Sequence, residues 1–126
     1  MKLISFLSLI FCAATLFAQT TDFSGKKFEQ IDEIPNSTTH LHFKSNTESV
    51  FVMTNIMMSG KTYIDECPCK TTVKGNNIEI SCICEDKELY PDPITDSFVY
   101  DSATNSLKST SYSDRNRNPI YWKFKN

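Results

Sequence analysis

The stretch CPCKTTVKGNNIEISCIC, residues Cys67 to Cys84, decides the fold because two Cys-x-Cys pairs flank a glycine turn. A two-residue turn at Gly75-Asn76 would join two antiparallel strands, with glycine first as a type II′ turn requires. In that register the facing residues are Lys74 and Asn77, Val73 and Ile78, Thr71 and Ile80, Cys69 and Cys82, and Cys67 and Cys84. Each of these four cysteines therefore gains a cysteine partner across the hairpin.

The same register predicts the surroundings of the sulfur atoms. Both cysteine pairs fall at non-hydrogen-bonded positions, where opposite Cα atoms lie about 4.5 Å apart, at the short end of the disulfide range. Strand alternation places the cysteines on one face with Ile78 and Ile80, so we expect them to face an apolar interior. Pro68 lies at a hydrogen-bonded position without an N–H to donate, which predicts a frayed or bulged strand beside Cys67.

We therefore predict two disulfides, Cys67–Cys84 and Cys69–Cys82, and no resident cofactor. The alternative is a metal site made of the same four residues, Cys67, Cys69, Cys82 and Cys84. The one-residue spacing suits structural zinc poorly, whereas copper(I) prefers thiolates and thioethers. Three methionines precede the cysteines, Met53, Met57 and Met58, although their plainer interpretation is core packing. A redox-active set of thiols is a third interpretation of the cysteines.

Residues 1–18 have the pattern of a cleaved signal peptide: Lys2, an apolar run from Leu3 to Phe17, and a small residue at Ala18. The run is shorter than the roughly 20 residues that a spanning helix needs, so we expect no membrane span. A lipid anchor at Cys12 is the less favoured alternative. Cleavage would leave residues 19–126 as one domain with four cysteines, and the oxidising periplasm or the extracellular space favours disulfides.

The charge of the chain argues against nucleic-acid partners. The formal net charge is −2, and the sequence contains no basic stripe of the kind that phosphate backbones require.

The mature chain has the pattern of an all-β protein, because β-branched and aromatic residues alternate with polar ones between turn residues. The expected strands are residues 26–31, 39–44, 49–58, 61–73, 77–84, 97–100, 106–112 and 119–125. About eight strands at this spacing predict a single antiparallel meander that forms a small barrel or a sandwich.

Other candidate sites have plainer interpretations. His40 and His42 share one strand face and could chelate a cation, but two ligands are few, and a solvated face is favoured. Five carboxylates, Glu85, Asp86, Glu88, Asp92 and Asp96, surround the connector 85–93 and are expected to be solvated. No nucleophile motif is present, so we expect no catalysis.

The outline from Phe23-Ser-Gly-Lys-Lys-Phe28 to Ile120-Tyr-Trp-Lys-Phe124 resembles the small lipocalin-like (calycin-type) domains of secreted bacterial proteins. The resemblance implies a β-barrel that binds a small apolar ligand or a protein partner at its mouth. We therefore expect a secreted or periplasmic binding module. The alternatives are a soft-metal (copper or zinc) protein of the cell envelope and a structural or immunity-type interaction protein.

Overall fold

The computed structural model describes residues 20–31 and 35–126 of the chain. The predicted signal peptide, including Cys12, lies outside these residues. In the described part eight strands follow one another: β1 Lys27–Gln30, β2 Ser37–Phe43, β3 Glu48–Ile56, β4 Thr62–Lys74, β5 Asn77–Cys82, β6 Ile94–Asp101, β7 Ser106–Ser113 and β8 Pro119–Lys125.

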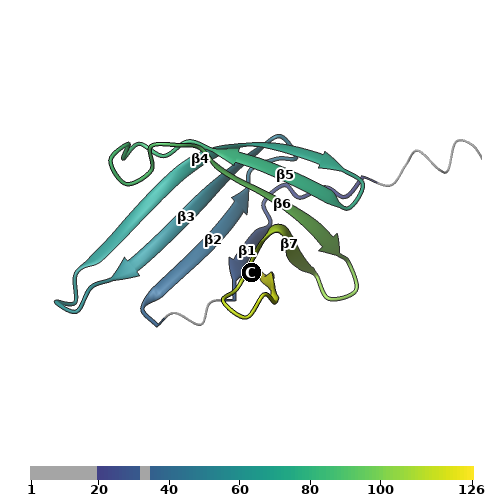
Figure 1. The fold of residues 1–126 in the computed structure, drawn as a ribbon. Coiled ribbons are helices and arrows are strands. Elements are labelled where there is room, and N and C mark those ends of the chain that lie inside the picture. Colours follow the sequence, from purple (N-terminus) through teal and green to yellow (C-terminus); the bar gives the residue numbers. More distant parts are fainter. Residues whose placement is uncertain (1–19, 32–34) are drawn as a thin grey trace, which may run out of the picture.

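The strands form a closed antiparallel barrel in chain order, with β8 pairing back to β1 (Figure 1). The predicted all-β meander is thus confirmed, and of the two predicted architectures the barrel is the correct one. Closure pairs every strand on both sides, which removes exposed sheet edges. None of the described residues belongs to a helix long and apolar enough to cross a membrane.

Alternation along each strand places the core inside the barrel. In β2, Leu41 and Phe43 are fully buried, whereas His40 and His42, which alternate with them, are only partly covered. In β8, Trp122 is buried and its neighbours Tyr121 and Lys123 are exposed. These faces agree with the alternation in the sequence.

The predicted register of the β4–β5 hairpin is confirmed, from Lys74 opposite Asn77 to Cys69 opposite Cys82. Gly75 has a φ of +59°, a conformation that glycine adopts without the steric penalty of a Cβ. β5 ends at Cys82, and beyond it the Ile83 N–H donates to the Pro68 carbonyl at 3.0 Å. Pro68 has no N–H and cannot donate a second hydrogen bond to the segment after β5, so the regular pairing of β4 with β5 ends there.

One end of the barrel, here called the closed end, is filled by Phe23 from the segment before β1. Phe23 is fully buried, and its ring centroid lies 5.2 Å from that of Phe43 and 5.0 Å from that of Tyr100. Asn46 holds the segment in place, because its Oδ1 accepts from the Phe23 N–H at 2.8 Å and its Nδ2 donates to the Thr21 carbonyl at 2.9 Å.

Candidate functional site

The four cysteines of the hairpin form two disulfides. Cys67 is bonded to Cys84 and Cys69 to Cys82, with Cα atoms 4.4 and 3.9 Å apart. All four are buried in the barrel core, on the face that the hairpin register predicts. A sulfur in a disulfide is not the thiolate that copper or zinc binds, so a metal at these residues would require both bonds to be reduced.

Outside the disulfides, no group of three or more His, Cys, Asp or Glu side chains in the described ranges is arranged to hold a metal ion. The two histidines lie on the outer surface of β2. His40 Nε2 lies 3.7 Å from Glu29 Oε1, and Lys125 Nζ lies 2.6 Å from Glu29 Oε2. His40 thus lies beside the Glu29–Lys125 ion pair on the surface.

The methionines do not form one group. Met53 faces inward and packs against the core, where its sulfur accepts a hydrogen bond from the Tyr90 hydroxyl at 3.6 Å. Met57 and Met58 lie in the β3–β4 turn and are exposed, Met58 completely. The expectation that all three fill the core is therefore wrong for Met57 and Met58, because β3 ends at Ile56 before reaching them.

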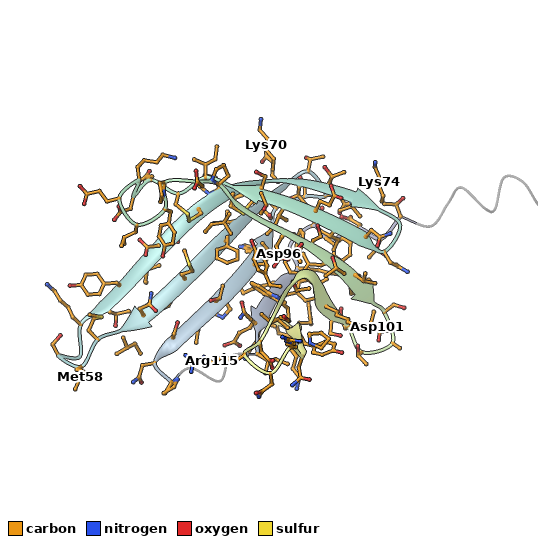
Figure 2. All side chains as sticks on the ribbon, in the orientation of Figure 1. Met58, Lys70, Lys74, Asp96, Asp101 and Arg115 are labelled. Carbon is orange, nitrogen blue, oxygen red and sulfur yellow. A yellow bond between two sulfur atoms is a disulfide. The ribbon has the colours of Figure 1, made fainter. Side chains whose placement is uncertain are left out.

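The prediction that Asp96 is a solvated connector residue is also wrong. Asp96 lies within β6, which begins at Ile94, and only 8% of its surface is exposed. Its side chain points to the same side as Ile94, Phe98 and Tyr100, which is the barrel interior. Figure 2 shows Asp96 between the two ends of the barrel, with Met58 and Arg115 labelled at one end and Lys74 and Asp101 at the other.

We call the end opposite Phe23 the open end; there β3 and β7 finish and β4, β6 and β8 begin. The inward-facing apolar side chains at this end pack against the core but remain only partly buried: Met53, Ile94 and Ile120, together with Tyr90 from the connector after β5. Partial exposure of side chains that point into a barrel means that solvent reaches this part of the interior.

Asp96 lies at the boundary between the packed core and the open end. Its Oδ1 accepts two hydrogen bonds of 2.8 Å, from the Ser97 backbone N–H and from the Ser109 hydroxyl. The Ser109 oxygen in turn accepts from the Tyr112 N–H at 3.2 Å. This chain of bonds lies where the β7–β8 register shifts between Lys108 and Ser113, and such irregularities commonly re-aim side chains near functional sites.

The second oxygen of Asp96, Oδ2, has no hydrogen-bond donor among the described residues. The one fully buried side-chain nitrogen or oxygen in this part of the chain that lacks a partner is Trp122 Nε1, so Asp96 Oδ2 retains contact with solvent. The two ion pairs found in residues 20–31 and 35–126 both involve Glu29. Asp96 is therefore a buried carboxyl without a cation. Its burial raises its pKa, against the lowering effect of the bonds from Ser109 and Ser97.

Trp122 Nε1 is the buried side-chain polar atom of the described residues that has no hydrogen-bond partner. The indole is 1% exposed, and its ring lies 5.5 Å from Phe98 and 5.9 Å from Phe51, centroid to centroid. Buried polar groups are nearly always hydrogen-bonded, so the Trp122 N–H is an exception among the described residues of the core.

Two carboxylates lie near Tyr90 at the rim of the open end. Desolvation raises the pKa of Tyr90, and the carboxylates of Asp65 and Asp86 raise it further, which places both carboxylates near the phenol. Asp65 lies directly opposite Met53 in the β3–β4 ladder. Cationic side chains lie at the same end, Lys61 in the β3–β4 turn and Arg115 and Arg117 in the β7–β8 turn (Figure 2), so the negative charge is local to the surroundings of Tyr90.

Three other surface features lie outside the barrel interior. A hollow of about 900 Å³ runs along β6 to β8, where Val99, Lys108 and Tyr121 line it, and reaches Tyr100 and Phe124 at the closed end. A second, of about 740 Å³, lies beside the disulfides, between Val50, Glu66 and Pro68. The third feature is a set of exposed apolar side chains around the end of the β3–β4 hairpin: Ile56, Met57, Met58, Tyr63 and Ile64.

Comparison of the chain with protein-family models, with curated proteins and with solved structures found no match. The eight-stranded antiparallel barrel is compatible with the lipocalin-like resemblance, and membership of that family stays a prediction.

Proposed function

We propose that the protein is a secreted or periplasmic binding module that takes up a small ligand with an apolar body at the open end of its barrel. The observation that carries this proposal is the difference between the two ends. At the closed end Val73 and Phe124 are partly exposed, but Phe23 is completely buried as an aromatic plug. At the open end Ile94, Ile120 and Met53 point inward and remain partly exposed, without a completely buried aromatic plug of this kind among the described residues. Binding sites are typically concave, mainly apolar and equipped with a few polar groups.

The two disulfides support the proposed cellular location. Such bonds persist in the periplasm and outside the cell but are rare in the cytosol, and the apolar run of residues 3–17 supports export. Removal of residues 1–18 would leave Phe23 close to the new N-terminus and available to fill the closed end.

The proposal includes no catalytic step. Ser109 donates to Asp96, but the chain's two imidazoles, His40 and His42, lie on the outer face of β2. A serine that donates to a carboxylate without a neighbouring base is poorly activated as a nucleophile. The described residues therefore favour binding over turnover.

A protein partner is the alternative ligand, and it would bind a different surface of the barrel. The exposed apolar side chains at the end of the β3–β4 hairpin are suited to such contacts. A small ligand in the open end would lose affinity when residues of the barrel interior are changed, whereas a protein partner on the β3–β4 hairpin would not.

Trp122 offers a direct test because it is the only tryptophan of the chain and lies two residues after Ile120 on the same face of β8. Titration of the exported protein with octan-1-ol should change the Trp122 emission in a saturable manner. The Ile94→Asn variant should weaken binding roughly tenfold through lost apolar contact. The matched variant Val99→Asn, on the outer face of the same strand, should bind as the wild type does. Absence of a saturable response, or equal loss in both variants, would count against the proposal.

A further inference from the structure

We infer that the ligand of the open end carries a cationic ammonium group, and that Asp96 is its counter-ion. This inference rests on the proposed function and names the chemical class of the ligand. It follows from the hydrogen bonding of one carboxyl group, the apolar side chains around it, and the charge at the rim.

The carboxyl group of Asp96 accepts hydrogen bonds through only one of its two oxygens. Both protein donors, the Ser97 N–H and the Ser109 hydroxyl, bond to Oδ1, and no described residue donates to Oδ2. Ser109 is itself fixed by the Tyr112 N–H. Asp96 is therefore held in one orientation by its neighbours, and its second oxygen remains open to a donor that comes from solvent.

The identity of the residue supports a role beyond packing. Asparagine would accept the same two hydrogen bonds through its own Oδ1 without a buried charge, and uncompensated charges in protein interiors are costly. A carboxylate at this position therefore adds nothing to the fold that an amide could not supply. It adds the ability to attract and pair with a cation.

The apolar body of the ligand has a place next to this carboxylate. Ile94 precedes Asp96 by two residues on the inner face of β6, and Ile120 and Met53 also point into the open end. An ammonium group that reaches inward to Asp96 would leave an attached alkyl chain among these side chains. The aromatic rings of Phe98 and Trp122 lie deeper on the same wall and provide apolar surface next to this position.

The rim supports the same class of ligand. Asp65 and Asp86 lie close enough to Tyr90 to raise the pKa of its phenol. Beside Tyr90 their charges favour an ammonium group over an anion. A fatty acid, which shares the apolar body but carries a negative head, would be disfavoured beside Tyr90 and at Asp96.

Three probes with the same alkyl chain test the inference: octylammonium, octan-1-ol and octanoate. Each is titrated near pH 7 into the exported wild-type protein, Asp96→Asn and Glu79→Gln, with binding followed by Trp122 emission and by calorimetry. Glu79 is exposed on the outer face of β5, so its variant makes the same change in net charge as Asp96→Asn without touching the interior.

The wild type should bind octylammonium at least about tenfold more tightly than octan-1-ol, and octanoate most weakly. In Asp96→Asn the affinities for octylammonium and octan-1-ol should lie within about twofold of each other. Glu79→Gln should keep the wild-type preference for octylammonium.

Binding of octan-1-ol with no preference for octylammonium would overturn the inference and leave the proposed function standing. Equal loss of preference in Asp96→Asn and Glu79→Gln would also overturn it, because the attraction would then come from net charge. If none of the three probes bound, both the inference and the proposed function would be wrong.

Discussion

Asp96 receives two hydrogen bonds from the protein and no cation, so its charge should lower the stability of the fold. Burial raises the pKa of Asp96 above the ordinary value of 3.8, whereas the unfolded carboxyl titrates near that value. Between these two pKa values the folded state binds more protons than the unfolded state. The free energy of unfolding therefore falls as pH rises from 3.8 through the raised pKa, and the loss is complete above it.

Asp96→Asn should remove this loss while keeping both hydrogen bonds. Denaturant unfolding should give the variant a higher midpoint than the wild type at about pH 7, and the difference should vanish at about pH 3, where the carboxyl is protonated in both states. A variant less stable than the wild type at both pH values would contradict the account, because the carboxylate would then contribute to the fold.

The inward orientation of Asp96 could have been predicted from strand alternation, but a second sequence pattern indicated a solvated loop. Pro91, Pro93 and the surrounding carboxylates indicate a solvated connector, and a single carboxylate next to them fits that pattern. The alternation of Ile94, Phe98 and Tyr100 nevertheless places every second residue inward. The unsatisfied Trp122 N–H could not be predicted, because hydrogen-bond satisfaction depends on the packing of three strands.

Among the elements, the β4–β5 ribbon was the most predictable. A glycine turn and four cysteines fix one register, and a slip by one residue would turn the sulfurs away from each other. The β7 irregularity had no comparable signal. The irregularity depends on the Ser109 hydroxyl, which bridges Asp96 and Tyr112. The sequence pattern does not distinguish Ser109 from the other serines of β7.

Ser109→Ala should therefore destabilise the protein by roughly 1–3 kcal/mol, because the buried Asp96 and the Tyr112 N–H both lose a partner. Denaturant unfolding measures the loss, and faster hydrogen exchange at Tyr112 would locate it. The exposed neighbour Thr110, changed to Ala, is the control and should cost clearly less. Equal losses in the two variants would show that Ser109 does not hold this part of β7.

The two disulfides close nearly the same loop, with sequence separations of 13 and 17. Loss of either one leaves the unfolded chain almost as restricted as before, whereas loss of both removes about 3 kcal/mol of chain-entropy stabilisation. Unfolding of the Cys67→Ala/Cys84→Ala, Cys69→Ala/Cys82→Ala and fourfold variants should therefore give a combined loss larger than the sum of the two separate losses. Simple additivity would mean that the bridges act independently.

At the scale of the whole molecule, the barrel depends on a residue outside its strands. Phe23 contacts Phe28, Phe43 and Tyr100, and Asn46 bonds its backbone. The sequence predicts the strands but not this plug, because no strand pattern includes Phe23 and its partners are distant in the chain.

Phe23→Ala should destabilise the protein by about 3–5 kcal/mol through lost burial and an unfilled closed end. Denaturant unfolding provides the measurement, and the exposed Tyr112→Ala is the matched aromatic control, which should lose much less. A loss below about 1 kcal/mol would mean that the segment is not part of the core.

The central claim is that the barrel is filled at one end and receives its ligand at the other. NMR shift mapping during titration with octylammonium tests this claim most directly. The account predicts that the largest changes fall on Met53, Ile94, Asp96 and Ile120 at the open end, while Phe23 and Phe43 at the closed end remain unchanged. Changes centred on Val99 and Tyr121 in the outer hollow, or an absence of changes at saturating probe, would contradict it.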